Sequence, residues 1–200
     1  MGFDNLPCIT PIFNDISNVF VRCNYNKWCI LDTVLSSISI AKQIKIVLTD
    51  VDGVLTDGGL YYSSEGDVMK KFHVRDGMGI SLLRKNNIPT IIVTKESTKM
   101  VKKWAKKMNA KLYDGIICKE KILPKICKQY DVSSSEIAYI GDDVNDVNLL
   151  KLVGLSVVPK DGTIMAKKSS KYVCKTNSGN GVFREVAELI LSAKKIPIIY

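Results

Sequence analysis

The stretch Ile44–Asp57, IKIVLTDVDGVLTD, decides the fold of this 200-residue chain. Its first half is an apolar run that predicts a strand buried on both faces, as in parallel sheets. Its second half places Asp50 and Asp52 directly after that strand, where side-chain alternation turns both carboxylates to the same side. Gly53 then permits a sharp turn. We therefore predict that a buried strand delivers two acids to one edge of a sheet.

The same arrangement, a buried strand followed by polar residues, recurs at Pro89–Val93 before Thr94 and at Ile137–Ile140 before Asp142 and Asp143. Helical patterns lie between these strands, at residues 77–87, 98–108, 119–129, 144–153 and 182–193. Such alternation is typical of an α/β fold, a doubly wound, mostly parallel sheet with helices on both faces. One β-hairpin interrupts it, formed by Leu60–Tyr62 and Val68–Phe72 around a polar turn. Because ligands bind at the carboxyl ends of such strands, the polar groups should converge there.

The converging acids, Asp50, Asp52, Asp142 and Asp143, would repel one another without a cation. Carboxylate oxygens suit Mg²⁺ better than zinc. The chain has one histidine, His73, and no paired cysteines at metal-binding spacing, which also disfavours zinc. Of the first two acids, one can act as a nucleophile and the other as a general acid and base.

Four motifs of the chain, taken in order, resemble those of the haloacid dehalogenase superfamily of phosphotransferases: Asp50–Asp57, Thr94, Lys119 and Gly141–Asp146. Two further segments, Phe72–Ile80 and Gly181–Glu185, resemble the branch of 3-deoxy-D-manno-octulosonate 8-phosphate (Kdo-8-phosphate) phosphatases. Close relatives of that branch act on nine-carbon, sialic-acid-type 9-phosphates. The resemblance covers about Ile44–Ala193 and implies a Rossmann-like domain without a cap domain, in which the hairpin forms a flap.

The resemblance also implies a Mg²⁺-dependent phosphatase that works through an aspartyl-phosphate intermediate. Asp50 would attack phosphorus, and Asp52 would protonate the leaving sugar oxygen and then activate water. Thr94 would donate a hydrogen bond to the phosphoryl group, and Lys119 would neutralise its charge. Taken alone, however, Lys119 could be an ordinary surface lysine. Mg²⁺ would be held by three residues and supported by two more: Asp50, the main-chain carbonyl of Asp52 and Asp142, with Asp143 and Asp146 behind them.

Three residues are candidates for binding the sugar acid. Family members commonly carry glycine after the second-motif threonine, whereas this chain has Lys95 followed by Glu96, which resembles the enzymes of nine-carbon substrates. Lys107 falls where those relatives carry a substrate-facing lysine, although its helix otherwise reads as a solvated face. Arg75 could bind the sugar-acid carboxylate, or it could equally pair with Asp76 or with a neighbouring subunit.

Residues 1–43 form an extension of unknown role, and residues 44–200 form the phosphatase domain. The net charge of +9 lies entirely in residues 44–200. Nucleic-acid binding would need aromatic interleaving or a recognisable reader motif, and neither is present. No apolar run reaches the roughly 18 residues of a membrane helix. Six scattered cysteines and the absence of a readable secretory signal indicate a reduced, cytoplasmic protein.

The spacing between the motifs leaves no room for a cap domain that would shield the site from water. The hairpin carries more apolar surface than it can cover alone, and packing against other copies of the chain would bury it. We therefore expect a homo-oligomer, a tetramer, in which a neighbour closes each site. The resemblance to the capless branch implies such an assembly and implies that the glycine-rich segment Ser178–Gly181 can reach a neighbouring site. A competing interpretation is a non-catalytic assembly module, like the domains that follow sialic-acid cytidylyltransferases. Retention of all four motifs argues against it.

Overall fold

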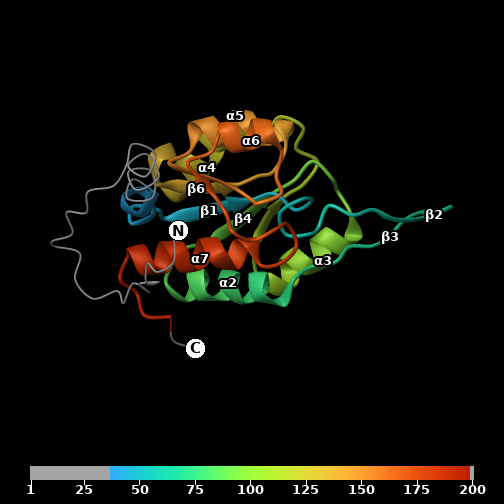
Figure 1. Ribbon diagram of the computed structural model, residues 1–200, viewed down its shortest axis with the longest axis horizontal. Coiled ribbons are helices and arrows are strands. Elements are labelled where there is room, and N and C mark those ends of the chain that lie inside the picture. Colours follow the sequence, from blue (N-terminus) through green and yellow to red (C-terminus); the bar gives the residue numbers. More distant parts are fainter. Residues whose placement is uncertain (1–36, 199–200) are drawn as a thin grey trace, which may run out of the picture.

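Six parallel strands form the centre of this computed structural model, which describes residues 37–198 (Figure 1). Their order across the sheet is β5-β4-β1-β6-β7-β8, and each neighbouring pair is parallel. The strands are β1 (Ile46–Thr49), β4 (Thr90–Val93), β5 (Lys111–Tyr113), β6 (Ile137–Ile140), β7 (Leu155–Val158) and β8 (Tyr172–Val173). The predicted α/β class with a parallel sheet is confirmed.

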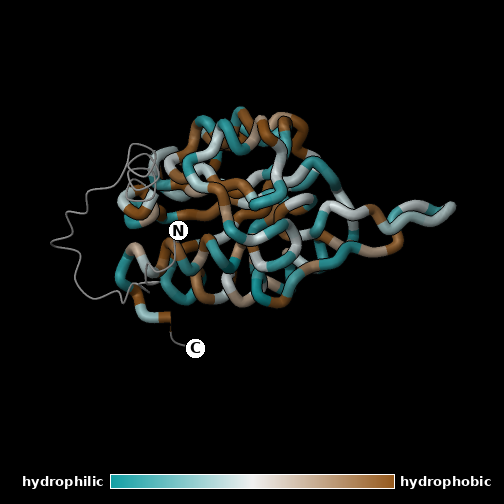
Figure 2. The backbone as a smooth tube through the Cα atoms, viewed as in Figure 1, coloured by the Kyte–Doolittle hydropathy of each residue, from teal (hydrophilic) through white to brown (hydrophobic). Residues whose placement is uncertain are grey.

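Helices cover both faces of this sheet (Figure 1). One face carries α2 (Val74–Lys85), α3 (Lys99–Met108) and α7 (Val182–Ala193), and the other carries α4 (Leu123–Tyr130), α5 (Val147–Leu152) and α6 (Ile164–Lys168). Alternate strand residues divide between the two layers: Val47 and Ile92 join one core cluster, and Leu48 and Ile91 join the other. In Figure 2 the most hydrophobic backbone accordingly lies on the strands between the helix layers.

Several helices begin or end where the sequence pattern did not place them. Helix α2 starts at Val74, because the Nδ1 atom of His73 accepts a hydrogen bond from the main-chain N–H of Arg75 at 3.2 Å and caps it. The segments predicted as helices from 119 and from 144 open with 3₁₀ turns, η1 (Lys119–Ile122) and η3 (Val144–Asp146); a third turn, η2 (Ser134–Glu136), precedes β6. The five-residue α6 was not predicted.

A short helix at residues 37–41 packs against the domain from its amino-terminal side. Ala41 is fully buried in the core, and the Ser37 hydroxyl donates to the carbonyl of Lys171 at 3.1 Å. The packed body therefore begins before Ile44, where the sequence pattern places the boundary. The sequence of residues 28–40 is also compatible with a short helix, but most of that stretch lies outside the described residues.

The β-hairpin of β2 (Tyr61–Ser63) and β3 (Gly66–Met69) projects away from the body (Figure 1). Its apolar side chains are exposed: Leu60, Tyr61, Tyr62, Val68 and Met69. At its base, Phe72 stacks on Trp104 of α3 with ring centroids 4.7 Å apart. The hairpin and α2 account for most of the chain between β1 and β4, and α3 and β5 account for most of the chain between β4 and η1.

Across residues 37–198, no helix combines the length and apolar character needed to cross a bilayer.

Candidate active site

The carboxyl ends of β1, β4 and β6 bring three predicted site residues together. Asp50 follows β1, Thr94 follows β4 and Asp142 lies two residues after β6. Because β1 lies between β4 and β6, these ends are neighbours at one edge of the sheet. A cavity of about 260 Å³ opens there, and its lining includes Asp50, Asp52, Thr94, Glu96, Asp142 and Asp143.

A buried ammonium group sits behind this cavity. Lys119 is fully buried, and its Nζ atom lies 2.6 Å from Oδ2 of Asp50 and 2.6 Å from Oδ1 of Asp146. Burial lowers the pKa of Lys119, but the two carboxylates outweigh burial, so the net shift is upward and the side chain stays charged. Lys119 is thus no ordinary surface lysine, and its charge is directed at Asp50.

Asp146 holds this arrangement in place through both of its oxygens. Oδ1 accepts from Lys119 and also from the hydroxyl of Tyr139, at 2.5 Å. Oδ2 accepts from the main-chain N–H groups of Asp142 at 2.8 Å and Asp143 at 3.3 Å. Sequence analysis missed Tyr139, because within an apolar strand nothing distinguishes a structural tyrosine from one that supports a site.

Three carboxylates at the edge of the cavity could hold a cation. One oxygen each of Asp50, Asp142 and Asp146 lie within 4.8 Å of one another. Burial, reinforced by the charges of Asp50 and Asp146, raises the pKa of Asp142 to about 8. Burial also raises the pKa of Asp50 to about 6, although Lys119 opposes the shift. Concentrated negative charge on oxygen donors fits a hard divalent ion such as Mg²⁺. Each oxygen of Asp146 accepts two hydrogen bonds, whereas each oxygen of Asp50 has one partner, the Val51 N–H or Lys119, so Asp50 and Asp142 are the better candidates to bind it.

Gly53 keeps this cluster open. Its φ is +77°, in the left-handed region, and a Cβ atom at this position would lie 2.0 Å from Oδ2 of Asp142. Any other residue would therefore displace a candidate ligand as well as strain the turn. The glycine predicted to permit a turn also makes space for the metal site.

The Asp52 side chain lies apart from the acidic cluster. Its Oδ1 atom accepts from the Nζ of Lys70 at 2.6 Å and from the hydroxyl of Thr56 at 3.2 Å. Lys70 also donates to Oε2 of Glu96 at 2.9 Å. The sequence did not single out Lys70, because it belongs to no recognised motif and follows a hairpin strand.

Thr94 is oriented by its main chain. Its N–H donates to the carbonyl of Tyr113 and its carbonyl accepts from Ile116, both at 3.0 Å. The Thr94 hydroxyl makes no hydrogen bond to any of residues 37–198, so it is free to donate to a phosphoryl oxygen. Lys95 does not have a positive φ, so the main chain at this position does not require the glycine that family members commonly carry after the second-motif threonine.

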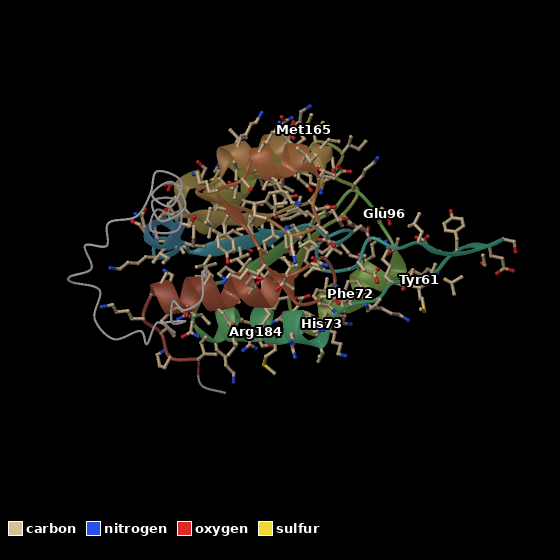
Figure 3. All side chains as sticks on the ribbon, in the orientation of Figure 1. Tyr61, Phe72, His73, Glu96, Met165 and Arg184 are labelled. Atoms are coloured by element: carbon tan, nitrogen blue, oxygen red, sulfur yellow. The ribbon has the colours of Figure 1, made fainter. Side chains whose placement is uncertain are left out.

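The predicted sugar-binding residues are not brought together within one chain. Glu96 lines the cavity, on the side of the body from which the hairpin projects (Figure 3). Arg75 instead lines a separate cavity of about 370 Å³ with Asn180 and Arg184, and Lys107 is exposed on α3. Asp76 does not pair with Arg75; its Oδ1 accepts from the main-chain N–H of Arg184 at 3.0 Å and so caps α7.

The glycine-rich segment before α7 packs on its own chain. The buried hydroxyl of Ser178 donates to the carbonyl of Gly53 at 2.6 Å and to Oδ1 of Asp161 at 2.8 Å. A Cβ atom on Gly179 would lie 2.4 Å from the main-chain nitrogen of Asp57. Ser178 and Gly179 therefore support the first-motif loop of their own chain, and the reach of this segment to a neighbouring site stays a prediction about the oligomer.

The proteins that this chain resembles include phosphatases. A sequence model of the haloacid dehalogenase-like hydrolases matches residues 115–186. The 3-deoxy-D-manno-octulosonate 8-phosphate phosphatase of Haemophilus influenzae is 37% identical over 154 residues, which cover 76% of this chain and 86% of that protein. N-acylneuraminate cytidylyltransferase A of Danio rerio is 36% identical over 156 residues, which cover 76% of this chain but 36% of that protein.

A solved structure extends the comparison to three dimensions. The 3-deoxy-D-manno-octulosonate 8-phosphate phosphatase of Moraxella catarrhalis, crystallised with magnesium ion, phosphate ion and a KDO molecule, superposes with a TM-score of 0.77. It is 36% identical in sequence, and the match covers 80% of this chain and 92% of that one.

Proposed function

This chain belongs to the haloacid dehalogenase-like hydrolases, in the branch of the Kdo-8-phosphate phosphatases, and from that membership we propose its substrate and mechanism. It is a phosphatase, and we propose that it removes the terminal phosphate from a 3-deoxy-ulosonic or nonulosonic sugar acid with the help of Mg²⁺. One observation carries the proposal. Asp50 directly follows β1, and its Oδ2 atom lies 2.6 Å from the Nζ atom of the fully buried Lys119, in a cavity that Asp142 and Thr94 also line.

Asp50 is the nucleophile of the proposed mechanism. Its carboxylate attacks phosphorus, so that a bond from Asp50 to phosphorus forms as the bond to the sugar oxygen breaks. Lys119 orients Asp50 and balances the charge that builds up on the phosphoryl oxygens, while Thr94 donates to one of them. Asp50, the Asp52 carbonyl and Asp142 would hold Mg²⁺, and the bound ion would offset more of the negative charge on the phosphoryl oxygens.

Asp52 moves the protons of the proposed mechanism. Its side chain gives a proton to the departing sugar oxygen, which leaves as an alcohol. It then takes a proton from a water molecule that attacks the aspartyl-phosphate, releasing phosphate and restoring Asp50. The separation of Asp52 from the acidic cluster supports this division of labour, because its side chain is tied to Lys70 instead.

We infer from Glu96 that nine-carbon 9-phosphates are turned over at least as well as Kdo-8-phosphate. Glu96 lines the same cavity as Asp50 and Asp52, where it can accept hydrogen bonds from sugar hydroxyls. Lys107 lies outside that cavity within one chain, so a role for it, like one for Arg75, would require a neighbouring subunit.

The exposed hairpin supports a homotetramer as the active form. Leu60 and Tyr62 are 69% and 71% exposed, and a second copy of the chain could cover them. Light scattering at micromolar concentration should give a mass well above the 22.2 kDa of one chain; a fully active monomer would refute the shared site.

The cytoplasm remains the proposed location, supported by free thiols at Cys118, Cys127 and Cys174.

A second candidate function is a non-catalytic assembly module, suggested by the similarity to a cytidylyltransferase. Phosphate release from a panel of sugar phosphates, measured with Mg²⁺ and with EDTA, separates the two. Asp50→Asn should abolish release while the fold persists, whereas Asp131→Asn, the same change at an exposed helix end, should be without effect. Release by wild type that survives Asp50→Asn would refute the proposed nucleophile, and no release from any sugar phosphate would favour the assembly module.

A further inference from the structure

Lys70 lies where the hairpin joins the candidate active site. Its side chain is only 3% exposed, although it carries a charge. Its Nζ atom donates to Oδ1 of Asp52 at 2.6 Å and to Oε2 of Glu96 at 2.9 Å. Lysines are almost never buried unless they are paired, and this one is paired twice. One ammonium group therefore joins the loop after β1 to the loop after β4.

The pairing leaves the two oxygens of Asp52 in different situations. Oδ1 accepts from Lys70 and from the Thr56 hydroxyl, whereas no residue in the described part of the chain donates to Oδ2. The carboxylate is thus anchored through one oxygen, and its other oxygen is left for proton transfer. A general acid works only when it is held within reach of the leaving group, so this anchoring is relevant to the reaction.

The same ammonium group also fixes Glu96. Without it, two carboxylates would face each other across the cavity with no cation between them, and they would move apart. We propose that Lys70 is a positioning residue that couples proton transfer at Asp52 to sugar recognition at Glu96. This inference rests on the proposed phosphatase function, since it assigns no chemistry of its own to Lys70.

The hairpin base supplies the rigidity that such a role requires. Two residues after Lys70, Phe72, labelled in Figure 3, stacks on Trp104 with ring planes 12° apart, and this contact fixes the chain where it leaves the hairpin. The next residue after Lys70 offers a matched control. Lys71 is 50% exposed and lies 3.5 Å from Asp57, so it has the same chemistry without the burial or the double pairing.

Three phosphate esters test the proposal, with Lys70→Met compared with Lys71→Met. p-Nitrophenolate leaves without a proton, so kcat/KM for p-nitrophenyl phosphate should stay within about twofold of wild type. The alcohol that leaves from glycerol phosphate must be protonated by Asp52, so kcat/KM for this ester should fall about tenfold or more. That loss is part of the 10²–10⁴-fold rate enhancement that a general acid supplies. A nine-carbon sugar-acid 9-phosphate should lose more, because recognition at Glu96 is also disturbed. Equal losses on all three esters, or losses matched by Lys71→Met, would overturn the coupling.

Two further variants guard against a simple loss of folding. Lys70→Arg keeps a cation that can bridge both carboxylates, so it should recover part of the activity on glycerol phosphate. In the double variant Lys70→Met/Glu96→Gln, the loss of kcat/KM on a nine-carbon sugar-acid 9-phosphate should be smaller than the product of the two single losses. Independent, multiplicative losses would contradict a shared ammonium group.

A readout without activity keeps this inference separate from the proposed function. Limited acylation with an amine-reactive ester, followed by mass spectrometry, should modify the buried, doubly paired Lys70 more slowly than the exposed Lys71, and Glu96→Gln should accelerate the modification of Lys70. Should wild type hydrolyse none of the esters, the proposed function fails. In that case a protected Lys70 still supports the paired geometry, and a Lys70 as reactive as Lys71 overturns it.

Discussion

Replacing Lys119 with methionine tests the centre of the site most directly. The change keeps an unbranched apolar stem but removes the ammonium group at its end, which lies 2.6 Å from both Asp50 and Asp146. Removing one partner of a buried ion pair lowers the free energy of unfolding by about 3–5 kcal/mol. With a fall in Tm of about 2–4 °C for each kcal/mol in a domain of this size, Tm should drop by at least roughly 6 °C.

The destabilisation should also depend on pH, in a predictable direction. Burial raises the pKa of Asp50 from 3.8 to about 6 even with Lys119 present, and loss of Lys119 removes an attraction that lowers it. An acid whose pKa is higher in the folded state weakens the fold above that pKa. This loss of stability disappears as the pH falls from about 6, the pKa of Asp50 in the folded chain, toward 3.8, its ordinary value. The difference between wild type and Lys119→Met should therefore shrink from pH 7.5 to pH 5.

Urea denaturation followed by circular dichroism, in EDTA at both pH values, measures this difference. Lys121→Met serves as the control, because Lys121 lies on the same 3₁₀ turn but is exposed. A loss of less than about 1 kcal/mol at pH 7.5, within the range of an exposed ion pair, would refute the assignment of Lys119 as a buried counter-ion. A loss that does not change with pH would refute the link to Asp50.

Three other predictions concern the metal, the fold and the substrate. Because the pKa of Asp142 is about 8 without metal, Mg²⁺ affinity should fall as the pH drops from 8.5 to 6.5, and calorimetry in buffers of different ionisation enthalpy should detect proton release; a flat affinity would count against Asp142 as a ligand. Burial raises the pKa of Asp76 to about 6, so wild type should gain stability relative to Asp76→Asn as the pH falls from 7 to 4, and parallel urea curves would contradict this. Glu96→Arg should shift the ratio of kcat/KM values toward Kdo-8-phosphate and away from nine-carbon 9-phosphates, and an unchanged ratio would remove Glu96 from substrate recognition.

The parts of the site that could be predicted from sequence are those fixed by position along a strand. Asp50, Thr94 and Asp142 each follow an apolar run, and parallel strands bring such residues to one edge. Lys119 was predicted from its motif, because no local pattern distinguishes a lysine that will be buried. Its role depends on Asp50 and Asp146, which are distant in sequence and meet it only in the folded chain.

The parts that could not be predicted depend on contacts between elements. Lys70 looks like any lysine at the end of a hairpin strand, and its burial arises because two loops converge on it. The start of α2 was misplaced because Gly77 and Gly79 interrupt its helical pattern, while the cap at His73 has no obvious sequence signature. Asp76 caps α7 from another helix, a contact that sequence spacing does not reveal.

The position of β1 has a consequence for how the protein opens. This strand is hydrogen-bonded to β4 on one side and β6 on the other, so its amide protons should exchange with solvent only when the whole domain unfolds. In the described chain β2 and β3 pair only with each other, and they should exchange through local opening at a much lower free energy. Asp50, the proposed nucleophile, thus follows the last segment to open, while Lys70 adjoins one of the first. On warming, proton transfer at Asp52 should therefore fail at a lower temperature than the placement of Asp50.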